Sequence, residues 1–168
     1  WQVSDPNGNL AESNEGNNIG VDYDDYPLNV VSYDLRGYFC DAPTQIAWGG
    51  TASLYCMVEN VGATAVTAPF YQQFYLSNDQ IWGDADDVQL GTNYDHQTDV
   101  PAQSQGPAFD FVFTLPSSAP AGFSGNGPFY IGMKTDALNE IAETNESNNG
   151  PGSGAQTWDW DSFTLAST

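Results

Sequence analysis

Hydrophobic and polar residues alternate with a period of two along much of the chain. The hydrophobic positions in phase are Leu54, Cys56 and Val58 in one run, Phe109, Phe111, Phe113 and Leu115 in a second, and Phe129, Ile131 and Met133 in a third. Such alternation is typical of strands that bury one face. Turn-forming clusters at 48–50, 60–62 and 124–128 separate the runs, and the one helix-like feature is a turn near 136–141. The pattern predicts an all-β fold built as an antiparallel β-sandwich.

Two cysteines, Cys40 and Cys56, fall within the predicted strands 35–40 and 51–58. With no CxxC pair and no nearby histidine they make a poor zinc site, so we predict a disulfide between neighbouring strands. A disulfide would place the protein in an oxidising compartment. The alternative is a pair of buried thiols that pack as small hydrophobic groups.

The chain contains an internal repeat at an offset of 131 residues. Residues 5–18 read DPNGNLAESNEGNN and residues 136–149 read DALNEIAETNESNN, with identity at seven of fourteen positions. Farther on, VDYDDYPL at 21–28 parallels WDWDSFTL at 158–165. A repeat of this kind indicates that the N-terminal copy corresponds to the end of a preceding module. We therefore expect an N-terminal extension, 1–28, and one whole module, 29–168, within a processed protein or a fragment of a longer one.

Four stretches of the second unit carry a family resemblance. They read FYLSNDQIWGDADDVQLG (74–91), TLPSSAPAG (114–122), YIGMKTD (130–136) and NEIAETNESNN (139–149). Together they resemble the CARDB family of bacterial and archaeal cell-surface domains, over residues 29–150. The resemblance implies an immunoglobulin-like β-sandwich on a secreted protein, related to cell adhesion and often present in tandem. It implies no defined activity, and the cysteine pair, the WDWD strand and the detached N-terminal copy depart from the family pattern.

The charge is strongly negative and unevenly distributed. The chain has 22 Asp and Glu residues against two Lys and Arg, for a formal charge of −20. So little positive charge excludes nucleic acid and anionic membrane surfaces as electrostatic partners. No apolar run approaches the roughly 20 residues that a membrane span needs, so we expect no membrane insertion. Six acids fall in each of 5–25, 79–99 and 136–161, and this clustering favours local cation sites.

The first candidate cation site is the loop 78–87. Its predicted calcium ligands are Asp79, Asp84, Asp86 and Asp87. Carboxylates this close repel one another unless they are protonated, splayed or bridged by a hard cation, and Ca²⁺ accepts six to eight oxygen ligands in a loose geometry. The spacing does not fit an EF-hand, and the alternative interpretation is a solvated acidic turn.

The second candidate is the segment 136–149. Its predicted calcium ligands are Asp136, Asn139, Glu143 and Glu146. On an extended chain the polar residues divide between two faces, each with carboxylate and amide oxygens, and either face would complete a shell begun by 78–87. The alternative is a polar edge strand whose acids discourage aggregation. The sequence at 145–147 also reads as a glycosylation sequon.

The third candidate is the N-terminal copy itself. Asp5, Glu12 and Glu15 are its predicted calcium ligands, and Asp5, Leu10, Asn14, Asn17 and Asn18 its predicted assembly contacts. The copy either folds back beside its own C-terminal counterpart or docks on a neighbouring molecule, where it adds a strand or shares calcium. We favour the second arrangement. Head-to-tail contacts of that kind are heterologous and generate open filaments.

Residue patterns do not favour catalysis. His96 has no evident nucleophile partner, and GxSxG and HExxH motifs are missing from the sequence. A glycosidase needs only two carboxylates, but the acids lie mainly in polar, Asn-rich runs, so we expect no enzyme and take His96 as a surface residue or minor ligand.

Carbohydrate binding is the stronger rival. The aromatic residues available to stack on sugar rings are Trp48, Trp82, Trp158, Trp160, Tyr23 and Tyr26. Trp158 and Trp160 share one face of a predicted strand and Asp159 and Asp161 the other, which favours core or interface packing for both tryptophans. Trp82, inside the acidic loop, is the exception.

The sequence therefore predicts an extracellular or cell-surface, calcium-binding structural module. We expect it to assemble end to end, as a homopolymer or with tandem neighbouring modules, into a fibre or surface array through its N-terminal repeat. The alternative is a carbohydrate- or protein-binding adhesin module of a larger tandem-repeat surface protein, with a glycan or host protein as its partner.

Overall fold

The computed structural model describes residues 2–3, 19–20, 31–152 and 159–166. The chain divides into two compact units, Trp1–Val30 and Val31–Thr168. In the first unit, β1 (Gln2–Val3) pairs with β2 (Ile19–Gly20) in antiparallel fashion. The predicted N-terminal ligands and assembly contacts lie outside the described residues, as do Tyr23, Tyr26 and Trp158.

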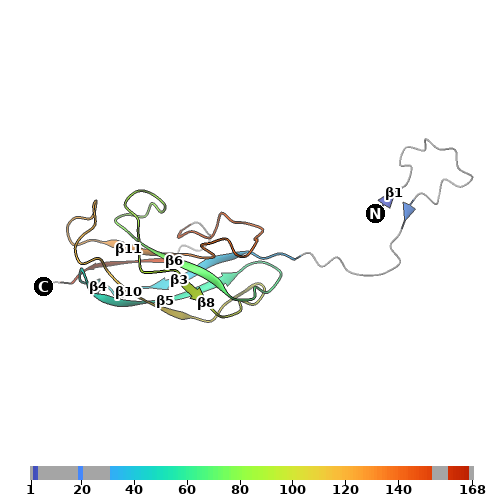
Figure 1. The fold of residues 1–168 in the computed structure, drawn as a ribbon, viewed down its shortest axis with the longest axis horizontal. Coiled ribbons are helices and arrows are strands. Elements are labelled where there is room, and N and C mark those ends of the chain that lie inside the picture. Colours follow the sequence, from blue (N-terminus) through green and yellow to red (C-terminus); the bar gives the residue numbers. More distant parts are fainter. Residues whose placement is uncertain (1, 4–18, 21–30, 153–158, 167–168) are drawn as a thin grey trace, which may run out of the picture. The chain divides into compact units, whose positions relative to one another are not determined.

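The second unit consists of two sheets packed face to face (Figure 1). One sheet has the order β10 (Phe109–Thr114), β5 (Thr51–Asn60), β3 (Leu35–Asp41), and β9 (Ser104–Gln105) also pairs with β5. The other has the order β4 (Gln45–Ile46), β12 (Trp160–Leu165), β11 (Phe129–Lys134), β6 (Phe70–Ser77), β7 (Val88–Gln89), and β8 (Tyr94–His96) also pairs with β6. Among the described strands only β4 and β12 pair in parallel. This is the arrangement of an immunoglobulin-like sandwich, so the predicted fold class is confirmed.

The core lies between the sheets and follows the predicted alternation. Leu54, Cys56 and Val58 on β5 are fully buried, and Ile131 and Met133 on β11 are buried opposite them in the sandwich. The rings of Phe74 and Phe111 stack across the two sheets with their centroids 3.8 Å apart. Trp48 also belongs to this core, because it packs on Phe129 at a centroid separation of 5.5 Å. The described residues include no helix that is long and apolar enough to cross a membrane.

The two cysteines lie directly opposite each other on β3 and β5. Both are buried, and their sulfur atoms are 3.1 Å apart, which is longer than the roughly 2.05 Å of a disulfide bond. The predicted juxtaposition is therefore present, but the cysteines are free thiols in this structure, in agreement with the alternative interpretation. Burial raises the pKa of the Cys40 thiol well above its ordinary value, so Cys40 is uncharged at neutral pH.

The strand β12 reverses the predicted orientation of its aromatic and acidic residues. Asp159 is fully buried beside Gly37, where an added Cβ would lie 2.5 Å from the Cβ of Asp159. Its Oδ1 accepts a hydrogen bond from the N–H of Gly152, and burial raises its pKa to about 6. Trp160 lies on the outer face, half-buried against Tyr130. The sequence alternates correctly along β12, but alternation alone does not determine which set faces inward.

His96 is not the predicted surface residue. Its side chain is 2 % exposed, because β8 turns the imidazole inward against the rings of Phe70 and Phe109. Burial lowers its pKa, so the ring is neutral near pH 7.

Candidate metal centres

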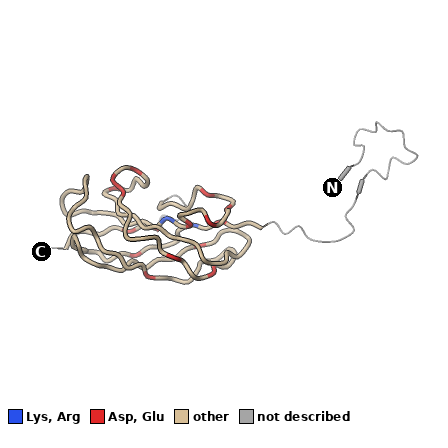
Figure 2. Tube along the Cα trace, in the orientation of Figure 1, with Lys and Arg blue, Asp and Glu red and all other residues tan. Residues whose placement is uncertain are grey.

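Acidic residues gather in two places along the trace of the second unit: the loop between β6 and β7, and the segment that follows β11 (Figure 2). In each place three carboxylates bring ligand oxygens within 4.8 Å of one another. Oxygens bound to one calcium ion, each about 2.4 Å from it, lie no more than about 4.8 Å apart. Each group therefore has the span of a partial calcium shell. They form two separate groups among the described residues, rather than the single shared shell that the sequence suggested.

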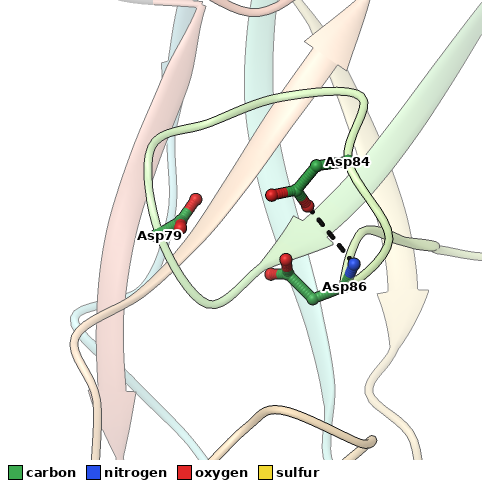
Figure 3. A group of neighbouring side chains, drawn as sticks. All are labelled: Asp79, Asp84 and Asp86. Carbon is green, nitrogen blue, oxygen red and sulfur yellow. Dashed lines mark hydrogen bonds between the residues drawn. The ribbon is translucent and has the colours of Figure 1, made fainter.

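The first group, which we call the loop group, consists of Asp79, Asp84 and Asp86 (Figure 3). Two of its carboxylates close short turns: the Oδ1 of Asp79 accepts from the N–H of Ile81 at 2.7 Å, and the Oδ1 of Asp84 accepts from the N–H of Asp86 at 3.2 Å. Turns of this kind are a common use of Asp in loops, and here they point three carboxylates toward one centre.

Asp84 and Asp86 influence each other's ionisation. A hydrogen bond between their carboxyl groups raises the pKa of Asp84 and lowers the pKa of Asp86. Of the two carboxyl groups, Asp86 therefore ionises first as the pH rises. A divalent cation would stabilise both carboxylates at once.

Asp87, the fourth predicted loop ligand, is not part of the loop group. Its Oδ2 accepts a hydrogen bond from the N–H of Gly83 at 2.5 Å, and its Oδ1 is buried and has no partner within the part of the chain that the structure describes. Trp82 is half-buried: its ring covers Gly132 on β11, where an added Cβ would meet it at 2.7 Å.

The second group, which we call the segment group, consists of Asp136, Glu143 and Glu146. The segment is a series of turns rather than the extended chain on which its two faces were predicted. Asp136 has a positive φ of 41°, and its two carboxylate oxygens accept from the N–H groups of Glu140 and Ile141, both at 3.0 Å. These bonds fold the chain back, so the strand parity predicted for the segment is wrong. Asn139, also a predicted ligand, is exposed and outside the group, and its N–H donates to the carbonyl of Asp136 at 2.9 Å.

The segment group is held more tightly than the loop group. Asp136 is fully buried, and Glu143 is half-buried. The Oε2 of Glu143 accepts a hydrogen bond from the N–H of Leu35, and the Oε1 of Glu146 accepts one from the N–H of Glu143 at 2.8 Å. Burial raises the pKa of Asp136, and it raises the pKa of Glu143 to about 8, with the neighbouring carboxylates adding to both effects. Without a cation, Glu143 therefore holds a proton at neutral pH.

Asn149 is a fourth polar side chain at the segment group, and it was missing from the predicted ligands. Its amide Nδ2 donates to Glu143 at 3.1 Å and to Glu146 at 3.4 Å. Its Oδ1 is buried and has no hydrogen-bond partner among the described residues, and the residue is only 2 % exposed. A 180° turn of the amide exchanges Nδ2 for Oδ1 and would present an oxygen ligand to a cation between the two glutamates. Both copies of the repeat end in two asparagines, and this recurrence is the feature of the sequence that could have identified Asn149.

The segment also binds the start of its own module. Thr144 donates to the carbonyl of Tyr33 from its N–H at 2.8 Å and from its hydroxyl at 3.0 Å. The amide of Asn148 donates to the carboxylate of Asp34 at 2.6 Å, and Glu143 accepts from Leu35 as described above. The segment group therefore lies directly on residues 33–35, with which the chain enters the sandwich.

No protein-family model and no curated protein matches the sequence. Among solved structures, the chain is similar to the CARDB domain of a Pyrococcus furiosus protein in complex with di-metal ions, with 17 % identity and a TM-score of 0.48 over 87 % of this chain and 100 % of that one. A solution structure of the same domain gives 17 % identity and a TM-score of 0.49 over 81 % and 97 %. A β-glucosidase from Erythrobacter marinus gives 14 % identity and 0.43 over 80 % of this chain but 16 % of that one. The resemblance to CARDB domains noted in the sequence thus recurs among similar structures, and at these identities it concerns the fold alone.

Proposed function

We propose that this protein is an extracellular, non-catalytic structural module in which calcium fixes the junction between consecutive modules. The observation that carries the proposal is the position of the segment group on residues 33–35. A cation held by Asp136, Glu143 and Glu146, with the amide oxygen of Asn149, would tie the end of the module to its beginning.

The internal repeat supports the same role for the N-terminal copy. At the offset of 131, Asp5, Glu12, Glu15 and Asn18 occupy the positions of Asp136, Glu143, Glu146 and Asn149. The four side chains that surround the segment group therefore all recur, in type and spacing, at the start of the chain. The N-terminal copy would hold the first residues of another module in the way that 136–149 holds 33–35, which links modules head to tail.

Charge favours a cation in this role. The described residues contain two basic side chains, and neither forms an ion pair with a member of the segment group; Arg36 is instead paired with Glu59 at 2.7 Å. Protonation or a divalent cation is then the remaining way to neutralise the segment group. Millimolar extracellular calcium would supply the cation, and weak extracellular sites bind in that range.

Sedimentation with electron micrographs of the same samples tests the assembly. We expect polymers of the purified chain in millimolar calcium and dispersed chains in excess chelator. The double variant Glu12→Gln with Glu15→Gln should remain dispersed in calcium, because it removes two ligands from the N-terminal copy. A double variant with the same charge change elsewhere, Asp95→Asn with Asp110→Asn, should assemble normally. Dispersed wild-type chains in both conditions would refute head-to-tail assembly.

A further inference from the structure

A pocket of about 430 Å³ lies beside the loop group and has no role in the proposed junction. The residues that shape it are Tyr75 on β6, Lys134 on β11, Trp82, Asp84 and Asp87 in the loop, and Pro151. Pockets of 300–1,000 Å³ are the usual size for small organic ligands. Its position on the outer face of the β6–β11 pair keeps it apart from the core.

The aromatic wall of the pocket is fixed in place. Tyr75 lies directly opposite Gly132 in the sheet, and the ring of Trp82 lies over the same glycine, where a side chain would collide with it at 2.7 Å. The hydroxyl of Tyr75 is also hydrogen-bonded to the Oε1 of Gln73 at 2.5 Å. Two rings held by the sheet form a preorganised apolar surface, which reduces the entropic cost of binding a ligand.

The polar groups of the pocket include both unused donors and unused acceptors. Among the described residues, the indole N–H of Trp82 and the Oδ1 of Asp87 have no hydrogen-bond partner, and both atoms have almost no accessible surface. Lys134 makes no ion pair among the described residues, whereas Arg36 is paired with Glu59. Hydroxyl groups both donate and accept, so a ligand rich in hydroxyls pairs with the carboxylates and the ammonium group that line the pocket.

We infer that this pocket binds one sugar ring of a neutral glycan. Tyr75 and Trp82 contact the apolar face of the ring, Asp87 and Asp84 accept from its hydroxyl groups, and Lys134 donates to another. An apolar ligand would displace water from two carboxylates and an ammonium group without replacing its hydrogen bonds, which is costly in a partly enclosed site. An anionic ligand would meet two carboxylates on a chain of formal charge −20.

The inference does not depend on calcium at the segment group or on head-to-tail assembly. One residue, Asp84, belongs both to the pocket and to the loop group, so a cation bound there would lie at the rim of the pocket. Glycan binding is therefore measured both in millimolar calcium and in chelator. Segment-group occupancy is followed separately, by calcium titration of the same samples.

Saturation-transfer NMR on the full chain tests the pocket, with the methyl glycosides of glucose, galactose, mannose and N-acetylglucosamine as probes. We expect transfer to at least one of them, and a loss of about tenfold in affinity in Lys134→Met and in Asp87→Asn. Trp82→Ala should abolish transfer. Ile81→Ala, which removes a 63 % exposed side chain of the same loop outside the pocket, is the control and should bind normally.

Lys134→Met keeps the proposal testable if Trp82→Ala unfolds the loop, because Lys134 is a half-exposed side chain on the outer face of β11. The inference is overturned if none of the four glycosides shows transfer, or if Lys134→Met and Asp87→Asn bind as tightly as the wild type. Normal calcium titration in the same samples would then show that the chain binds calcium but that the pocket does not bind a sugar. Sugar binding without calcium uptake would show the reverse.

Discussion

The loop group and the segment group offer a cation the same chemistry in different surroundings. Each brings three carboxylates within 4.8 Å. The loop group is formed by eight consecutive residues, 79–86, and its members are exposed or half-exposed. The segment group is built around a fully buried aspartate, and one of its glutamates accepts a hydrogen bond from Leu35, far away in the sequence.

This difference separates local from global consequences of binding. A cation in the loop group neutralises charges that water already screens, so it stabilises little beyond the loop. A cation in the segment group ionises Glu143, which holds a proton when no cation is present, and it acts on residues that join the end of the module to its start. We therefore expect both groups to bind calcium. Binding at the segment group should stabilise the whole fold, whereas binding at the loop group should not.

The largest expected effect is the loss of calcium-induced stability in Glu146→Gln. Saturating calcium should raise the unfolding midpoint of the wild type by about 10 °C, since ligand at about 100 times its Kd contributes about 2.7 kcal/mol. Glu146 is exposed, so its replacement should leave the midpoint in chelator within about 2 °C of the wild type while removing most of the calcium-induced gain. Calorimetry in calcium and in chelator measures both values.

The matched control is Asp84→Asn, which makes the same charge change in the loop group. It should retain nearly all of the calcium-induced gain. Equal losses in the two variants would mean that the surroundings of the two groups make no difference, and the comparison would fail.

A smaller effect tests whether the side chain of Asn149 binds calcium or only donates hydrogen bonds to the two glutamates. Asn149→Ala should weaken calcium binding about tenfold, which corresponds to about 1.4 kcal/mol. Asn149→Asp is the informative partner, because aspartate supplies an oxygen ligand but cannot donate to Glu143 and Glu146 as the amide does. If the side chain is a ligand, the aspartate variant binds calcium at least as well as the wild type in titration calorimetry. If the side chain only donates hydrogen bonds, the aspartate variant binds worse than the alanine variant.

The segment group should also make stability depend on pH when calcium is absent. The folded-state pKa of Glu143 is about 8 and that of Asp159 about 6, both above their ordinary values of 4.5 and 3.8. The folded state therefore retains protons that the unfolded state has lost, and stability falls as the pH rises from 5 to 8. Because Glu143 is only half-buried and solvent screens its charge, we expect a discounted loss on the order of 1–2 kcal/mol, which corresponds to a fall of roughly 5 °C in the unfolding midpoint.

Thermal unfolding in chelator from pH 5 to 8 measures how the unfolding midpoint depends on pH. In Glu143→Gln the midpoint should vary less with pH in the upper part of this range. In saturating calcium the trend should weaken or reverse, because the ion binds the deprotonated carboxylates. A midpoint in chelator that is constant from pH 5 to 8 would contradict the buried character of the segment group.

The sequence predicts those features that depend on neighbouring residues, and it does not predict those that depend on residues far apart in the chain. Alternation along 51–60 and 129–134 predicts the strands, because each strand buries one face and the period is a local property. The three members of the loop group are close in sequence and were found by spacing alone. The contacts of Asn149 with Glu143 and Glu146 are local, but they depend on turns that the extended-strand interpretation of 136–149 did not include. Sequence spacing could not reveal that Glu143 meets Leu35, because that contact joins residues 108 positions apart and forms only after the sandwich closes. The inward orientation of Asp159 and His96 was missed for the same reason, since each is buried against a strand distant in sequence.

The smallest expected effect lies in the loop group itself. Asp79→Asn combined with Asp84→Asn should remove one calcium ion per chain from the binding stoichiometry and change the unfolding midpoint in calcium by no more than about 2 °C. The reason is that the carboxylates being replaced are exposed or half-exposed, so neither their charge nor a cation bound to them contributes much to the folded core. Titration calorimetry gives the stoichiometry and calorimetric unfolding gives the midpoint on the same sample. A large drop in the midpoint would show that the loop, too, supports the fold, most directly through Trp82, whose ring covers Gly132 on β11. An unchanged stoichiometry with an unchanged midpoint would instead assign calcium binding to the segment group alone, and it would leave the loop as a solvated acidic turn beside the pocket.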